Sequence, residues 1–83
     1  MIRLLILKLV SKDEDSVTYH FYPENRLDAP PGYITVQFSD LKCTKAKKAD
    51  PDENMWYLHH ALARVRENIK NNHFPESEMV AWY

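Results

Sequence analysis

The chain has 83 residues, of which 45% are hydrophobic, and its eleven basic and twelve acidic residues leave a formal net charge of −1. This much apolar matter excludes an intrinsically disordered chain, and the near-zero charge argues against the strong basic excess usual in nucleic-acid binders. One cysteine excludes an internal disulfide and fits a reducing compartment. The apolar start is interrupted by Lys8 and followed by charges instead of a cleavage site. We therefore predict a cytoplasmic protein with a single domain over residues 1–83.

The first strand is predicted over residues 2–10, and it is apolar on both faces. Leu5 and Leu7 share one face, whereas Leu4 and Ile6 share the other. Such a strand is covered on both sides, or it lies where another element or subunit crosses it.

Two further strands are predicted over residues 17–22 and 33–38, where apolar and polar residues alternate. The acidic run at residues 11–16 lacks the spaced ligands and the glycine of a calcium loop, so a hairpin turn is predicted there. Gly32, the only glycine, follows two prolines and is expected to adopt a positive φ in a type II turn. Lysine-rich residues 41–48 are predicted to form an edge strand, because lysines discourage unwanted pairing.

One long helix is predicted from Asp52 to Asn72. At about 100° per residue one apolar stripe forms, flanked by Ala61. The stripe contains Met55, Leu58, Leu62, Val65 and Ile69. Capping is predicted from Asp50, Asp52 or Asn54 at the start, and from asparagines tolerated in left-handed backbone at the exit.

The tail at residues 79–83 (MVAWY) is too apolar to lie free in water. We expect it to add a strand beside the first one or to pack across a subunit boundary. The predicted fold class is therefore α+β: an antiparallel sheet of three to five strands, made of a meander plus a C-terminal strand, with one long helix packed on one face.

No catalytic, cofactor-binding or metal site is predicted. His59 and His60 are adjacent, so on a helix they point about 100° apart and do not chelate one ion. Cys43 lies among lysines that favour a thiolate, but no motif supplies a base, and a half-buried structural cysteine is the preferred interpretation. His20 and His73 approach other ligands only through folding.

The predicted functional feature is an interaction surface on the bare face of the sheet. Its candidate residues are Ile2, Leu4, His20, Tyr22 and Tyr33, and Trp56 of the helix and Trp82 of the tail are candidates for additional contacts. A partly bare mixture of aliphatic and aromatic side chains usually marks an interface. The leading hypothesis is a non-catalytic protein-interaction module or accessory subunit that self-associates, with no membrane contact. The alternative is a weak nucleic-acid-binding domain that uses Lys42–Lys48 and the outward tyrosines.

Four stretches of the chain also carry a resemblance. They are YHFYPE (Tyr19–Glu24), the Pro-Gly and strand of Pro31–Val36, HALARV (His60–Val65) and FPESEMVAWY (Phe74–Tyr83). Together they resemble a family of small uncharacterised bacterial proteins of about this length. The resemblance implies a complete small bacterial domain, and the family carries no assigned activity.

Overall fold

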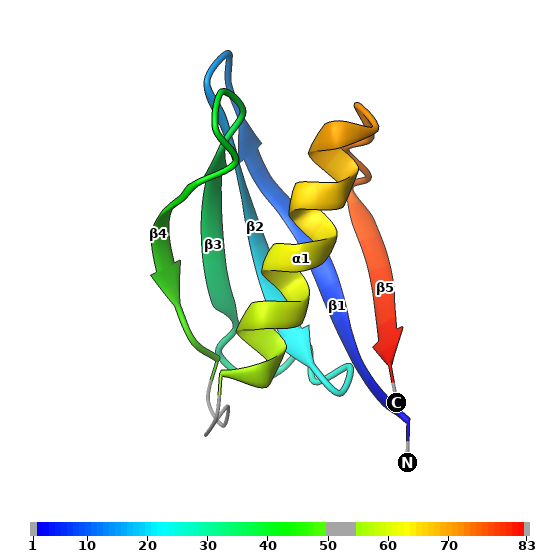
Figure 1. The fold of residues 1–83 in the computed structure, drawn as a ribbon. Coiled ribbons are helices and arrows are strands. Elements are labelled where there is room, and N and C mark those ends of the chain that lie inside the picture. Colours follow the sequence, from blue (N-terminus) through cyan, green and yellow to red (C-terminus); the bar gives the residue numbers. More distant parts are fainter. Residues whose placement is uncertain (1, 50–54, 83) are drawn as a thin grey trace.

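The computed structural model describes residues 2–49 and 55–82, and within them five strands and one helix. In chain order they are β1 (Arg3–Lys12), β2 (Ser16–Pro23), β3 (Gly32–Gln37), β4 (Cys43–Lys47), α1 (Trp56–Lys70) and β5 (Ser77–Trp82). The strands form one antiparallel sheet in the order β4-β3-β2-β1-β5, and α1 crosses one face of it diagonally (Figure 1). The predicted α+β class is confirmed, including the C-terminal strand beside the first.

The acidic run is a hairpin turn between β1 and β2, as predicted. One carboxylate oxygen of Asp13, Oδ1, accepts hydrogen bonds from the backbone N–H groups of Asp15 and Ser16, both at 2.8 Å. These backbone donors hold the pKa of Asp13 below its ordinary value, because they favour the charged carboxylate. The side chain thus closes the turn.

The core lies between the sheet and α1. Alternate residues of β1, β2 and β3 point toward the helix and are almost fully buried, as strand alternation requires. These residues are Leu5, Leu7, Val17, Tyr19, Phe21, Ile34 and Val36, and Val80 of β5 joins them. The alternation predicted for the second and third strands therefore corresponds to alternate burial, while Leu9 and Phe38 are only half-buried at the margin of the core.

Gly32 has a role different from the predicted one. Its φ is not positive, so it is not the left-handed residue of a type II turn; it is the first residue of β3. A Cβ atom here would lie 2.5 Å from Cε1 of Phe21 and 2.6 Å from the carbonyl oxygen of Lys47. Glycine is therefore required at this position of β3, because Phe21 of β2 and the backbone of Lys47 in β4 leave no space for a side chain.

The helix begins at Trp56, later than predicted, and its buried stripe is rotated relative to the predicted one. The predicted caps at Asp50, Asp52 and Asn54 lie outside the described residues. Met55 precedes the helix with a φ of 55° and an exposed side chain, so it is not part of the stripe. The buried residues of α1 are Leu58, Ala61, Val65 and Asn68, with Leu62 and Ile69 half-buried beside them.

The exit of the helix is fastened to the sheet through the segment that leads into β5. Asn72 adopts a φ of 52°, as predicted for an asparagine at this place, and His73 N–H donates to the carbonyl of Asn68 at 2.8 Å. The hydroxyl of buried Tyr19 donates to the carbonyl of Pro75 at 2.8 Å. Burial raises the pKa of Tyr19, which keeps the phenol protonated as a donor.

Candidate functional site: the outer face of the sheet

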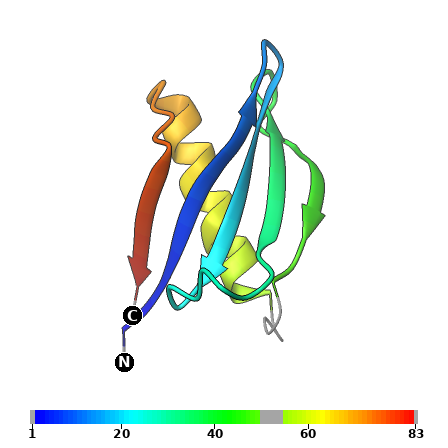
Figure 2. The same cartoon turned by 180° about the vertical axis from the view of Figure 1, so that it is seen from behind.

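We call the sheet surface opposite α1 the outer face; Figure 2 shows it from behind, with the helix on the far side of the sheet. The strand register defines its members, because opposite residues of antiparallel strands point to the same side. They are Leu4, Ile6, Lys8, Ser11, Ser16, Thr18, His20, Tyr22, Tyr33, Thr35, Gln37, Lys45, Lys47, Ser77, Met79 and Ala81. Neither α1 nor a second layer of strands from residues 2–49 and 55–82 covers this face.

One half of the outer face is aliphatic and lies over β1 and β5. Leu4 lies opposite Ala81, and Ile6 lies between Met79 of β5 and Tyr22 of β2. Met79 is 61% exposed, and Ile2, just before β1, is 56% exposed. The second apolar side of the first strand, noted in the sequence, is therefore left without a described covering layer, and such a patch is typical of an interface.

The other half is aromatic and basic and lies over β2, β3 and β4. His20 lies opposite Tyr33, and Tyr33 lies opposite Lys47. His20 also meets Tyr22 edge to face, with ring centroids 6.3 Å apart. The structure thus brings together the predicted surface residues Leu4, His20, Tyr22 and Tyr33 on one face.

The charge of the outer face is one-sided. Among the members defined above, lysines occur on β1 and β4, and no member is acidic. A face with this charge pattern attracts acidic surfaces even though the whole chain is nearly neutral.

Trp56 and Trp82, the two candidates for additional contacts, do not lie on the outer face. Trp82 points to the helix side, where its ring stacks on His60 with centroids 3.8 Å apart and meets Tyr57 edge to face at 5.4 Å. Trp56 is 49% exposed at the start of α1, and the guanidinium of Arg3 lies 5.1 Å from its ring centroid. The physical reason is strand parity: Trp82 follows Val80 on the core side of β5.

A cluster of contacts near the two tryptophans joins the start of α1 to the start of β1. The hydroxyl of Tyr57 donates to Oε2 of Glu24 at 2.6 Å, and this oxygen also accepts from the backbone N–H of Leu4 at 3.2 Å. Burial and the bond to Glu24 raise the pKa of Tyr57, and Arg3 opposes the shift. This cluster ties helix, loop and first strand together, so we assign it to stability.

The stacking of His60 on Trp82 predicts a pH dependence of folding. Burial, together with neighbouring His59, lowers the pKa of His60 below its ordinary 6.5, so the unfolded chain binds a proton more readily than the folded one. The contribution of His60 to stability should be fully present near neutral pH and should be lost as the pH drops from about 6.5 to the lower folded-state pKa. Thermal melts between pH 7.5 and 5 would show this fall, and His60→Gln should reduce it. An equal fall in His60→Gln would contradict the assignment.

The lysines of the predicted basic stretch, Lys42–Lys48, do not all lie on the outer face. Lys45 and Lys47 are on the outer face, whereas Lys42 lies in the turn before β4, where its N–H donates to Oδ1 of Asp40 at 3.0 Å. Cys43 is half-buried against the core, and its thiol donates to the carbonyl of Lys45 at 3.2 Å. This geometry supports the structural interpretation of the cysteine, and only two lysines of the stretch contribute to the face.

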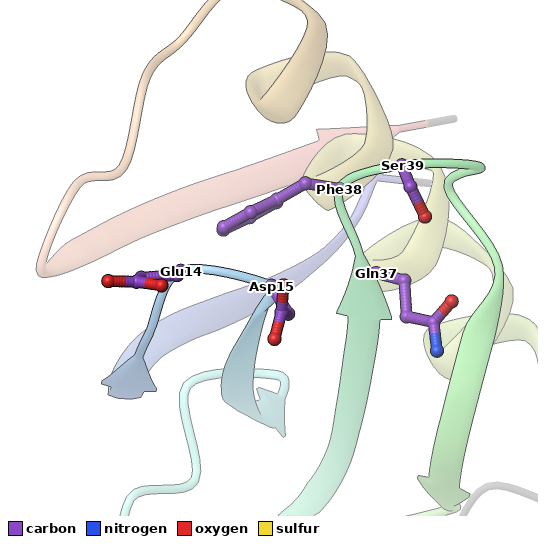
Figure 3. Close-up of a pocket in the computed structure, with 5 residues that line it drawn as sticks. All are labelled: Glu14, Asp15, Gln37, Phe38 and Ser39. Carbon is purple, nitrogen blue, oxygen red and sulfur yellow. The ribbon is translucent and has the colours of Figure 1, made fainter.

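A shallow cavity of about 540 Å³ opens at the tips of the two hairpins (Figure 3). It is lined by Glu14, Asp15, Gln37, Phe38 and Ser39. Figure 3 shows Glu14 extending away from Gln37 and Ser39, so the polar groups do not converge on one point. The ring of Phe38 is held instead by Phe74, edge to face at 5.6 Å, and by the ammonium of Lys12 at 5.7 Å from its centroid. The cavity therefore presents no arrangement for catalysis.

His20, His60, His73 and Cys43 do not come together in one site. In the part of the chain that the structure describes, no three His, Cys, Asp or Glu side chains come together in a way that would hold a metal ion. His20 is on the outer face, His60 stacks on Trp82, and His73 lies beyond the helix.

Comparisons with known proteins add no assignment: no family model, no curated protein and no solved structure matches the chain. The resemblance to small bacterial proteins stays a prediction. Within residues 2–49 and 55–82, no helix is long and apolar enough to cross a bilayer.

One contact was not predicted from the sequence: the side chain of Glu78 on β5 binds two residues of α1. Its carboxylate accepts from Nη1 of Arg64 at 3.1 Å and from Nδ2 of Asn68 at 2.8 Å. Neither Arg64 nor Asn68 belongs to the apolar stripe predicted from the sequence, although Asn68 is buried. The spacing of four residues between Arg64 and Asn68 was the available signal for a shared partner.

Proposed function

We propose that this protein is a small non-catalytic interaction module that binds a protein partner through the outer face. The observation that carries the proposal is the composition of this face: aliphatic over β1 and β5, aromatic and basic over β2 to β4, and without acidic members. An apolar centre beside a polar, charged margin is the usual anatomy of a protein interface.

The chemistry of the face also defines the partner. Ile6, Met79 and Tyr22 supply the apolar contact, and a complementary surface needs aliphatic or aromatic groups there. Lys8, Lys45 and Lys47 require carboxylates at the margin of the partner, which would speed encounter and fix orientation. The partner is therefore expected to be a protein with an apolar patch bordered by acidic residues.

Co-purification from the native cell, with two matched lysine variants, tests this proposal. Ile6→Lys places a charge in the aliphatic half, and Ala63→Lys places the same charge on an exposed position of α1. A stoichiometric partner should be retained by the parent and Ala63→Lys and reduced at least tenfold in Ile6→Lys, about 1.4 kcal/mol of binding free energy or more.

The same melting temperature for both variants would show that the fold is intact. Retention of the partner by Ile6→Lys together with its loss in Ala63→Lys would contradict the proposal, because it would place the binding surface on the helix.

Single-stranded nucleic acid is the second candidate, favoured by one observation. Tyr33 has Lys47 beside it on one side and His20 on the other, so stacking and phosphate contacts are available on adjacent strands. If this function holds, Tyr33→Ala should weaken oligonucleotide binding about tenfold or more. With three lysines engaged, the logarithm of the binding constant should fall with log salt at a slope of about −2.

Ile6→Lys separates the two candidates. It should abolish binding of an apolar protein surface and leave or strengthen binding of an oligonucleotide, because it adds a cation to the same face. Fluorescence anisotropy with labelled oligonucleotides at 50 and 200 mM salt would measure this. Absence of binding at the lower salt would exclude the nucleic-acid function.

A further inference from the structure

The two edges of the sheet are built differently. The outer face of edge strand β4 carries Lys45 and Lys47, which discourage pairing with another strand. Edge strand β5 carries one charged residue, Glu78, and this residue is held on the helix by Arg64 and Asn68. The edge of β5 is therefore left without the charged side chains that usually guard such a strand.

The backbone groups at the free edge of β5 follow from its pairing with β1. Leu9 N–H donates to the carbonyl of Glu76 at 2.9 Å, and in an antiparallel ladder the residues that bond to one neighbour alternate. The backbone N–H and C=O groups of Glu78, Val80 and Trp82 therefore point toward β1. Those of Ser77, Met79 and Ala81 point away from the sheet. Among the described residues, no strand pairs with this side of β5.

We propose that β5 pairs with β5 of a second copy of the chain, antiparallel about a two-fold axis at Met79. Met79 would lie opposite Met79 of the second copy, and Ser77 opposite Ala81 of the second copy. This register uses all three outward residues in each chain and forms about six backbone hydrogen bonds. The pairing is isologous, as closed dimers require, and brings no like charges opposite each other.

A second copy of the chain is favoured as the partner of the β5 edge because its outer face would extend the outer face of the first copy. In this respect the inference rests on the proposed function. The aliphatic half of the outer face ends at β5, so pairing β5 with itself joins two aliphatic halves into one central patch. A single face of five strands has a flat footprint of roughly 20 by 20 Å, or about 400 Å². Two faces side by side approach the roughly 800 Å² per partner of a standard interface.

Sedimentation velocity of the full chain over a concentration series tests the pairing, with a matched pair of proline variants. Ala81→Pro removes an N–H group that faces the free edge of β5. Ala46→Pro does the same at the free edge of β4. Gln37 N–H donates to the carbonyl of Lys42, so the alternate residues Tyr33 and Thr35 bond to Lys47 and Lys45, and the N–H group of Ala46 between them faces outward. Both alanines are exposed, and proline is tolerated on edge strands when its nitrogen faces solvent.

The parent and Ala46→Pro should dimerise with a Kd in roughly the micromolar range, and Ala81→Pro should weaken dimerisation at least tenfold. In the dimer, amide exchange should be slow at Ser77, Met79 and Ala81 and should speed up on dilution. These amides are the ones that β1 does not protect, so a change confined to them reports pairing at the edge.

A parent chain that sediments as a monomer up to about 0.5 mM would overturn the proposal, as would a dimer unaffected by Ala81→Pro. A monomer whose co-purified protein is lost in Ala81→Pro would also overturn it, in favour of a strand from another protein. Ile6→Lys should leave the dimer intact, because Ile6 is on β1, away from the edge. Failure of the outer-face function and failure of the edge pairing are therefore distinguishable.

Discussion

Replacing Gly32 by Ala should lower the free energy of unfolding by about 1–3 kcal/mol, a large effect for the addition of one methyl group. The new Cβ would lie 2.5 Å from Cε1 of Phe21 and 2.6 Å from the carbonyl oxygen of Lys47. The Phe21 ring is fully buried and the carbonyl belongs to the backbone, so neither moves without disturbing the packing of its strand. Urea denaturation followed by circular dichroism would measure the change.

The double variant Phe21→Leu/Gly32→Ala provides the control. If packing is the cause, the two changes should be non-additive, with the double variant more stable than the sum of the single effects predicts. Additive losses, or a Gly32→Ala variant as stable as the parent, would contradict the close-packing role of Gly32.

Removing residues 80–83 should lower the free energy of unfolding by about 4 kcal/mol or more, which is at least about a third of the total stability. Val80 is only 4% exposed, and full burial of such a side chain stabilises a fold by about 1.5–3 kcal/mol. Trp82 adds its stack on His60 and its contact with Tyr57, worth about 2 kcal/mol for a half-buried ring. The total stability of a domain this size is roughly 4–12 kcal/mol. Thermal melts by circular dichroism would detect the loss.

Two point variants in the same strand refine this test. Trp82→Ala should lower stability by about 2 kcal/mol, whereas Ala81→Ser, at an exposed position, should change it by less than about 0.5 kcal/mol. A truncated chain with the melting temperature of the parent would show that β5 does not hold the fold.

Much of the fold could be predicted from the sequence, because periodicity reports burial directly. Val17, Tyr19 and Phe21 alternate with polar residues, and the structure buries these three. The buried face of the helix was harder to predict, because it is not purely apolar. Asn68 is buried in place of an aliphatic residue, and its hydrogen-bond partner Glu78 lies on β5. A pattern of hydrophobicity contains no sign of such a polar contact between elements.

The candidate site was predicted in part, for a related reason. Outward Leu4, His20, Tyr22 and Tyr33 followed from strand alternation, which is a local property. The strand that contains Trp82 was predicted beside the first one, but the side to which its ring points depends on the register with β1, which the sequence does not specify.

The central claim, that the outer face binds a protein, is tested most directly by methyl NMR of the labelled full chain in extract of its native cell. The account predicts that the methyl signals of Leu4, Ile6 and Met79 shift or broaden, since these groups lie at the contact. The methyl signal of Ala63, exposed on α1, should stay unchanged. Broadening at Ala63 with unchanged signals from Leu4, Ile6 and Met79 would contradict the claim.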